Sequence, residues 1–219
     1  MEAAPSDHVI PPSSKLVAGE LCLDFANTAD WHASRRPRET LTSYETLLAW
    51  AVRAGVLPAE DAARLGWEAA RHPVAAVAAL RQALALREAI YRVATSMVSR
   101  QAPLPADVEK LDHALAGTLQ HRRLAVGPDG PAWTWNHDGR ALERVVWPVA
   151  LSAGDLFTSD RRERIGQCAD DRGCGWLFLD TTKNHSRKWC AMDDCGNRAK
   201  AQRHYRRSRH GAVHPAVAE

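Results

Sequence analysis

The sequence has no long hydrophobic run and few aromatic residues. No apolar stretch approaches the ~20 residues that a membrane-spanning helix requires, and aromatic side chains make up only 6% of the chain. The first thirty residues also lack the basic segment followed by an apolar segment that marks a secretion signal. These absences argue against a membrane protein or an exported one, and they predict a cytoplasmic location.

The common sequence patterns of catalytic sites are missing as well. There is no nucleophile elbow, phosphate-binding loop or paired-carboxylate pattern, so we do not expect an enzyme. The polar residues Asp24, Asn27, Asp30 and His32 follow the first apolar segment and keep catalysis open as a competing hypothesis. Loss of an activity in Asp24→Ala, with folding intact, would support that hypothesis.

What the chain does contain is enough apolar material for a globular core. Its 219 residues are 45% hydrophobic and 25% charged, which fits one core with a small accessory module. Leu21, Leu23 and Phe25 alternate with Cys22 and Asp24, and this alternation predicts a strand with one buried face. Cys22 is then a small residue on that strand.

Helical periodicity and turn residues predict most of the remaining N-terminal part. Helices are expected from 42–43 to Gly55, from Pro58 onward, from Pro73 to about Arg100, over 107–120, and over 140–157 with a bend at Pro148. A hairpin is expected from segments 124–126 and 132–135 around the turn 127–130. The predicted fold class is α+β, with a mostly helical N-terminal domain, a small β-sheet and a small C-terminal metal-binding module.

Charge and cysteine both concentrate at the C-terminal end. Residues 1–160 hold 16 basic and 19 acidic side chains, whereas residues 161–219 hold 13 and 7. A basic excess in one part of a chain is typical of a part that meets a polyanion. We expect a flexible arm over 1–18, a regulatory domain over 19–158, a metal-binding domain over 161–210 and a flexible tail over 211–219.

Four of the five cysteines form two close pairs. Five residues separate Cys168 from Cys174, four separate Cys190 from Cys195, and fifteen lie between the pairs. Both pairs are looser than the usual two-residue spacing, but the separation between them fits a four-thiolate zinc site. We predict that these four residues bind Zn²⁺. His185 lies between the pairs and could replace one of them, and a set of unrelated buried thiols is the other alternative.

The surroundings of the cysteines indicate the kind of module. An apolar segment, 175–180, lies between the pairs, and a helical run begins at 196–198 and continues to about Arg209. A knuckle, a strand or hairpin, and a helix whose first turn supplies the last ligands make a treble-clef-like zinc finger. The chemistry agrees, because a helix N-terminus favours thiolate over thiol.

These residues are similar to a known family. The stretch WCAMDDCGNRAK at 189–200, preceded by CGWLFLD at 174–180, resembles the CGNR zinc-finger family of bacteria. In that family the finger follows an N-terminal domain called ABATE, and LCLDFANT at 21–28 resembles the opening motif of that domain. The resemblance implies a stress-related transcription regulator, and it identifies no ligand or target.

The helical run after the last cysteine is strongly basic. It has no acidic residue from Arg198 to His210, and residues 183–210 hold nine Lys and Arg against two Asp. A zinc ion with four thiolates carries about −2 and neutralises only part of this charge, so the rest predicts contact with double-stranded DNA. The DNA-contacting residues expected on one broad arc of the helix are Arg198, Lys200, Arg203, Arg206, Arg207 and Arg209.

Two further expectations concern the faces of this helix. The narrow side with Ala201, Tyr205 and Ser208 is expected to dock on the finger, and Arg198 or Lys200 at the helix start is expected to read bases. A solubilising or protein-binding helix is the alternative, and the finger is then a zinc-stabilised protein-interaction module. Salt-sensitive binding to random duplex DNA would separate the two readings.

The predicted regulatory domain has one candidate ligand site. Asp24 and Asn27 lie at the end of the predicted strand, so they could line a cleft against the long helix around Arg87 and Tyr91. One hypothesis is a small-molecule effector site, and the other is that these polar groups cap the loop before Trp31. The domain could also be a scaffold or a dimerisation unit, which would make the protein a homodimer.

Overall fold

The structure is a computed structural model that describes residues 15–136 and 139–211, with side chains described up to residue 208. Most of the expected arm and tail, 1–18 and 211–219, lies outside this range. The end of the arm belongs to the fold, contrary to our expectation. Ala18 is fully buried, and the N–H groups of Val17 and Ala18 donate to the Asp24 carboxylate at 2.8 and 2.9 Å.

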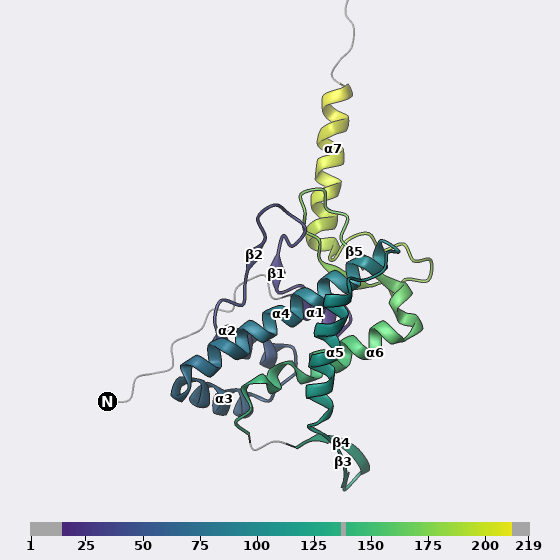
Figure 1. Cartoon of the computed structure of the whole chain (residues 1–219). Helices are drawn as coiled ribbons and strands as arrows, with labels where there is room; N and C mark the ends of the chain where they lie inside the picture. Colours follow the sequence, from purple (N-terminus) through teal and green to yellow (C-terminus); the bar gives the residue numbers. More distant parts are fainter. Residues whose placement is uncertain (1–14, 137–138, 212–219) are drawn as a thin grey trace, which may run out of the picture.

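Helices form most of the described chain, and the strands are short (Figure 1). The α-helices are α1 Leu21–Ala26, α2 Tyr44–Arg53, α3 Ala59–Arg71, α4 Pro73–Val98, α5 Pro105–Leu119, α6 Trp147–Thr158 and α7 Asn197–Gly211. The strands are β1 Ala29–Asp30, β2 Arg38–Glu39, β3 Arg122–Gly127, β4 Gly130–Trp135, β5 Ile165–Gln167 and β6 Leu177–Leu179, paired consecutively as antiparallel ribbons. The predicted fold class is confirmed.

The strand predicted over 21–25 is wrong, because this segment is helix α1. Cys22 and Leu23 are neighbours and both are fully buried, which a strand with one solvent face would not allow. Helix α1 contacts α4, α6 and β6, and Phe25 and Ala26 are buried along with Cys22 and Leu23. A short apolar run buried on several sides has no clear period, and the alternation in the sequence was misleading for that reason.

The longer helices begin and end where local chemistry predicts. Ser43 and Thr46 form a reciprocal capping box at the start of α2, and Gly55 follows the helix with φ +69°. Pro73 lies in the first turn of α4, where its missing N–H leaves no hydrogen bond unmade. Helix α4 buries nine residues along one side and forms the centre of the core.

Pro148 does not bend a helix as expected. A 3-10 turn, Leu142–Val146, precedes it, and α6 begins at Trp147 with the proline in its first turn. The predicted hairpin is confirmed as β3–β4, whose strands meet through the pair Gly127 and Gly130. Strand β5, which follows the 3-10 turn Asp160–Arg164, was not predicted.

Strand β6 separates two apolar clusters, one on each of its faces. Leu177 and Leu179 pack into the main core with α1, α4 and α6. Trp176 and Phe178 point to the other side and pack with the four clustered cysteines. The cysteine-rich segment therefore shares a strand with the helical body and does not pack beside it as a separate domain.

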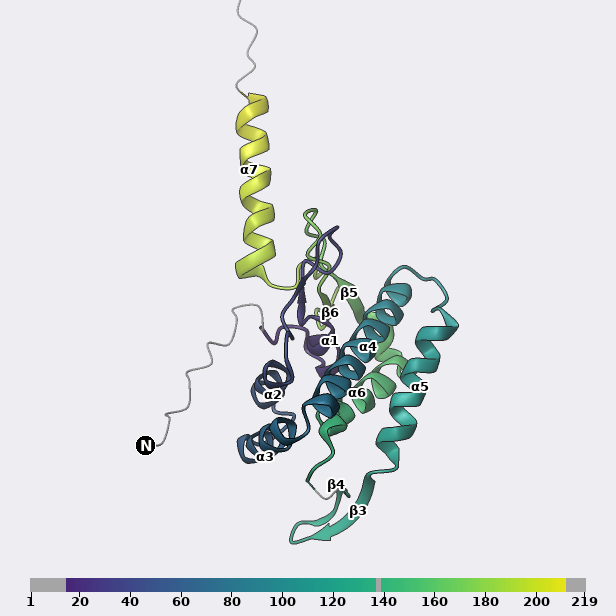
Figure 2. The same ribbon diagram turned by 60° about the vertical axis from the view of Figure 1, so that its left-hand side comes forward.

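The molecule is elongated, with α7 at one end and the β3–β4 hairpin at the other (Figures 1 and 2). Both views show α7 projecting from the body, and the ribbon β1–β2 lies near its base. None of the helices in the described ranges combines the length and the apolarity needed to span a bilayer.

Candidate metal centre and nucleic-acid interface

The four cysteines predicted as ligands come together. The Sγ atoms of Cys168, Cys174, Cys190 and Cys195 all lie within 4.8 Å of one another, and all four residues are buried. Two of the sulfur–sulfur distances are 3.8 Å, for Cys174 and Cys190, and 3.5 Å, for Cys190 and Cys195. A tetrahedral four-thiolate zinc ion with bonds of about 2.3 Å needs sulfurs about 3.8 Å apart. The site therefore fits a tetrahedral metal ion, and His185 is exposed and outside it.

Local structure explains the position of each half of the site. Cys168 directly follows β5, and its N–H extends the strand ladder by donating to the Trp176 carbonyl at 2.8 Å. The chain then turns back through Cys174 to Gly175, whose φ is +67°. A Cβ at Gly175 would lie 2.5 Å from the Ala33 Cβ, so only glycine fits there. Cys195 lies in the π-helical turn Met192–Gly196, immediately before α7 begins.

Arg198 is bound to the metal centre and its acidic neighbours. Its Nη2 donates to the Cys195 sulfur at 2.7 Å, and its Nε and Nη2 donate to Asp170 Oδ2 at 3.1 and 3.0 Å. It also pairs with Asp194, and its guanidinium lies 5.3 Å from the centre of the Trp31 ring. Arg198 supplies local positive charge to the thiolates, so its position does not support the expected role in reading bases.

The ionisable groups of the four-cysteine site favour a bound cation. The hydrogen bond with Cys168 raises the pKa of Cys195 above its ordinary range, because four adjacent thiols cannot all ionise on their own. Burial opposes ionisation of Asp170, but the Arg172 N–H and the Arg198 guanidinium hold its pKa below the ordinary value. A divalent cation with nearby arginine is the arrangement that lets all four thiols bind as thiolates.

Sequence reasoning missed the structural role of Arg187, which it counted only as charge. The Arg187 guanidinium donates to the carbonyls of Val17 and Cys190 at 2.8 and 2.6 Å, and it lies over the Phe178 ring at 4.4 Å. These contacts join the N-terminal end of the fold to the second cysteine pair. Val17 is 170 residues away along the chain, so no local pattern could identify this contact.

Several hydrogen bonds connect the finger to the helical body. The Asn27 amide makes two with the Leu177 backbone, both at 2.8 Å. The Trp176 indole N–H donates to the Ala29 carbonyl at 2.9 Å, and the His32 N–H donates to the Cys174 carbonyl at 3.0 Å. These bonds bind the ends of α1 and β1 to the metal-bearing segment.

The four residues expected to form an effector cleft bind protein groups instead. Asp24 accepts the N–H groups of residues 17 and 18, and Asn27 is occupied by the β6 backbone. Arg87 is 4% exposed and makes a bidentate pair with Glu39 at 2.7 Å. The Tyr91 hydroxyl donates to the Gly175 carbonyl at 3.2 Å. None of the four lines a described cavity.

The His32 side chain is 6% exposed and lies at the same joint. Its ring stacks on Tyr91 with centroids 3.6 Å apart, and its Nε2 lies 3.1 Å from Glu88 Oε2. Burial alone would raise the pKa of Glu88, but His32 and Arg87 together lower it to about 2. The polar residues after α1 are therefore part of a packed, charged joint between the body and the finger.

Most of the described part of helix α7 is exposed. Residues 200–208 are all exposed, and Tyr205 is 61% exposed, so the expected docking of Ala201, Tyr205 and Ser208 on the finger is wrong. The main contacts of α7 are with the turn that carries Cys195. Lys200, Arg203, Arg206 and Arg207 are presented to solvent, and the Arg209 side chain lies outside the described residues.

The fold and the site define a class of protein: a helical body joined through a shared strand to a four-cysteine metal finger that ends in a basic helix. Two family models match in the same order. The ABATE model, described as "Putative stress-induced transcription regulator", matches residues 19–160, and the CGNR zinc finger model matches residues 164–208. The chain belongs to the ABATE family and has a CGNR zinc finger at its C-terminal side. The expected resemblance is confirmed.

Neither family description is enzymatic, and both suit a regulator. No curated protein matches the chain.

Proposed function

We propose that the protein is a transcription regulator that binds double-stranded DNA through α7, with Zn²⁺ held by the four cysteines. The observation that carries the proposal is the exposed helix itself: four Lys and Arg lie on residues 200–208 without an acidic residue among them, and the helix starts at the metal-held turn. A solvated surface helix usually mixes the two signs of charge.

The dimensions of α7 suit a duplex groove. A helix of 15 residues is about 22 Å long and, with side chains, about 10–12 Å across, whereas the major groove is about 12 Å wide. Arg203 and Arg207 are four residues apart and lie on one side, where arginine can bind phosphate oxygens or a guanine edge. Because Arg198 is bound to Asp170 and Cys195, we assign the base-reading role at the helix start to Lys200.

Zinc would act as a structural ion in this proposal. It would be bound by Cys168, Cys174, Cys190 and Cys195, and it would supply folding energy to the turn from which α7 starts. Arg198 would neutralise part of the thiolate charge and hold the first turn of the helix. The direction in which α7 leaves the body then depends on the metal.

The test is binding of the zinc-loaded protein to random duplex DNA at low salt. We expect tight, salt-sensitive binding that is lost when Lys200, Arg203, Arg206, Arg207 and Arg209 are all changed to Gln. Equal binding by the two proteins would reject DNA binding through α7. In that case the protein-interaction module is the better reading, and the exposed helix is a docking element for an acidic protein.

Effector sensing has a better candidate site than the one expected from sequence. A cavity of about 560 Å³ lies between α4, α5 and the start of α6, with Leu86, His113, Gly117, Glu143 and Trp147 among its lining residues. This volume is in the usual range for small-molecule sites. A Cβ at Gly117 would meet nothing within 4 Å, so Gly117→Leu can fill the cavity. A metabolite that raises the melting temperature of the parent chain but not of this variant would support the site.

Assembly into a homodimer stays a prediction. Three large apolar side chains are exposed on the β3–β4 hairpin, far from α7: Leu124, Val126 and Trp133 are 64%, 84% and 63% exposed. Sedimentation of the parent chain and of a Val126→Lys, Trp133→Lys variant would show whether this hairpin mediates self-association.

A further inference from the structure

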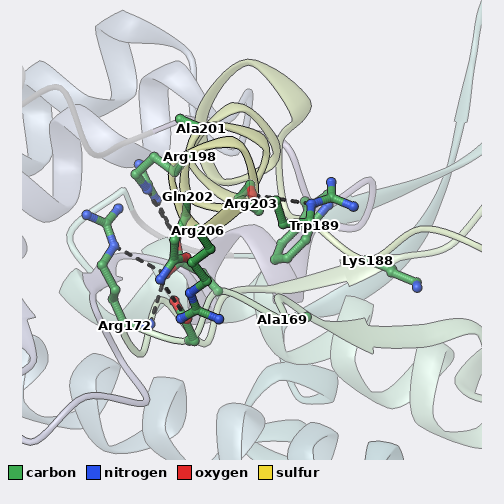
Figure 3. A pocket seen from close by; sticks show the side chains of 12 residues that line it. Ala169, Arg172, Lys188, Trp189, Arg198, Ala201, Gln202, Arg203 and Arg206 are labelled. Atoms are coloured by element: carbon green, nitrogen blue, oxygen red, sulfur yellow. Dashed lines mark hydrogen bonds and ion pairs between the residues drawn. The ribbon is translucent and has the colours of Figure 1, made fainter. Parts of the chain in front are cut away.

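A groove with two basic walls runs along the base of α7 (Figure 3). One wall is the helix, with Arg203 and Arg206, and the other is the body of the finger, with Arg172 and Lys188. The groove encloses about 700 Å³. Two of these basic residues, Arg172 and Lys188, lie outside the helix from which DNA contacts were expected.

Three alanines and one aromatic side chain also line the groove. Ala169, on the finger, and Ala199 and Ala201, on α7, contribute only methyl groups, and Trp189 is half-buried beside Arg203. Linked phosphates can approach the surface closely where these alanines line it. The groove therefore combines basic side chains on both walls with positions of little side-chain bulk, as a phosphate track requires.

Two carboxylates line the groove, and they differ in exposure and in hydrogen bonding. Asp170 has a side chain that is 4% exposed, and Arg198 holds it with two hydrogen bonds. Asp171 is 56% exposed, accepts a hydrogen bond from Gln202 Nε2 at 3.1 Å, and lies 3.7 Å from Arg206 Nη2. The Asp171 carboxylate thus occupies a position in which Gln202 and Arg206 of α7 bind an anionic group.

We propose that this groove binds one phosphodiester strand of the duplex whose major groove holds α7. Arg172 and Lys188 contact phosphates from the finger side, and Asp171 competes with the phosphates for Gln202 and Arg206. The proposal rests on the proposed binding of DNA through α7, and it adds a second set of contacts and an internal competitor.

The chemistry of the two anions supports the exchange. A phosphate oxygen and a carboxylate oxygen accept from the same guanidinium and amide donors, and arginine binds both in similar geometry. Lys200 and Arg207 do not line the groove. They are seven residues apart, about two helical turns, so they share one side of α7. That division leaves Arg203 and Arg206 for the strand in the groove and leaves Lys200, at the helix start, for the base edges.

The experiment compares matched single variants of the full-length, zinc-loaded protein. Lys188→Gln removes one groove charge, and Lys183→Gln removes an exposed lysine from the same segment, outside the groove. The probe is a labelled mixed-sequence duplex, measured by anisotropy between about 50 and 200 mM salt. We expect Lys188→Gln to weaken binding at low salt and to flatten the slope of log affinity against log salt by about 0.9, with no such change in Lys183→Gln.

Asp171→Asn tests the competitor. It keeps the size of the side chain and removes its charge, so affinity for the duplex should rise several-fold at low salt. Equal slopes in the Lys188→Gln and Lys183→Gln variants would overturn the groove proposal, and so would weaker binding in Asp171→Asn with the fold and zinc content intact. DNA binding through α7 would survive both results if Arg203→Ala, Arg207→Ala still abolished it. Tighter binding of single-stranded DNA or RNA than of duplex would overturn the placement of a duplex strand here.

Discussion

The side-chain amide of Asn27 pairs with the backbone of Leu177 as an adjacent strand would. Its Nδ2 donates to the Leu177 carbonyl at 2.8 Å, and its Oδ1 accepts the Leu177 N–H at 2.8 Å. Asn27 is 2% exposed, so water has little access to either bond. One side chain of the helical body therefore completes the edge of β6, whose neighbours Trp176 and Phe178 pack on the cysteines.

Changing Asn27 to Ala should destabilise the whole chain. The change leaves the N–H and the carbonyl of Leu177 buried without partners, at about 1–3 kcal/mol each, so the free energy of unfolding should fall by about 2–6 kcal/mol. Chemical denaturation measures this loss. Asn197→Ala is the control, since Asn197 is exposed and makes a single 3.4 Å hydrogen bond. A loss below about 1 kcal/mol would contradict the role given to Asn27.

Metal removal should affect both parts of the chain. We expect one zinc ion per purified chain, and none in Cys190→Ser. From sequence alone, loss of metal would unfold only the C-terminal module, but Leu177 and Leu179 lie in the main core. We therefore expect the variant to melt earlier as a whole, with helical circular dichroism and metal content as the measurements. A metal-free chain with unchanged melting would refute a structural metal.

The stability of the fold should depend on the titration of Asp24. Burial raises the pKa of its carboxyl to about 6, although the Ala18 and Val17 N–H groups and Arg187 oppose the shift. The pKa of Asp24 is higher in the folded state than in the unfolded state. Its contribution to the free energy of unfolding is therefore fully present below about pH 4 and is lost as the pH rises through about 6. Above that pH the buried charge costs the folded state up to about 3 kcal/mol.

Asp24→Asn should remove this cost while keeping the hydrogen bonds, because both N–H groups donate to Oδ1. The variant should be more stable than the parent at pH 8 and about equal to it at pH 4. Parallel denaturation curves at the two pH values measure the difference, with the exposed Asp112→Asn as control. A gain at pH 4 as large as that at pH 8 would show that charge is not the cause.

Gly55 and Gly175 have similar positive φ values but different surroundings. Substituting each of them therefore separates the cost of backbone strain from the cost of a steric clash. Gly55 has φ +69° and Gly175 has φ +67°. A Cβ meets nothing within 4 Å at Gly55 but lies 2.5 Å from the Ala33 Cβ at Gly175. Gly55→Ala should therefore cost only about 1–2 kcal/mol. Gly175→Ala should cost more and should also weaken zinc binding, as measured by competition with a chelator. Equal losses of stability in the two variants, with zinc binding unchanged, would mean that Ala33 shifts easily to make room for the added methyl group.

The basic arc of α7 gives a prediction about salt. If about four of its residues contact phosphate, log affinity should fall with log salt at a slope near −3.6. Arg203→Ala together with Arg207→Ala should weaken binding to every duplex, whereas Lys200→Ala should change the preference among sequences. Arg198→Ala should lower zinc retention before it alters sequence preference, because Arg198 contacts Cys195. Anisotropy with a panel of duplexes would reveal the opposite pattern if Arg198 reads bases.

The sequence alone determined the features that depend on neighbours along the chain. Four cysteines in two close pairs defined the metal-binding set, since each pair is brought together by a short turn. Helices α2 to α4 were predictable because Ser43, Pro58 and Pro73 mark their starts and their apolar residues repeat at helical spacing. Helix α5 was predicted from its apolar spacing to begin at 107, two residues after its observed start at Pro105. The excess of arginine and lysine after Cys195 was likewise visible without any fold.

Tertiary structure alone decided the features that depend on distant partners. Helix α1 was mistaken for a strand because α4, α6 and β6 bury it on several sides, and that burial erases the periodic pattern. Asn27 and Leu177 are 150 residues apart, and Arg198 and Asp170 are 28 apart, so their pairing follows from the packed core and not from spacing. Side-chain composition shows which groups can bind a metal or an anion. Only the fold determines which of those groups are already occupied by the protein itself.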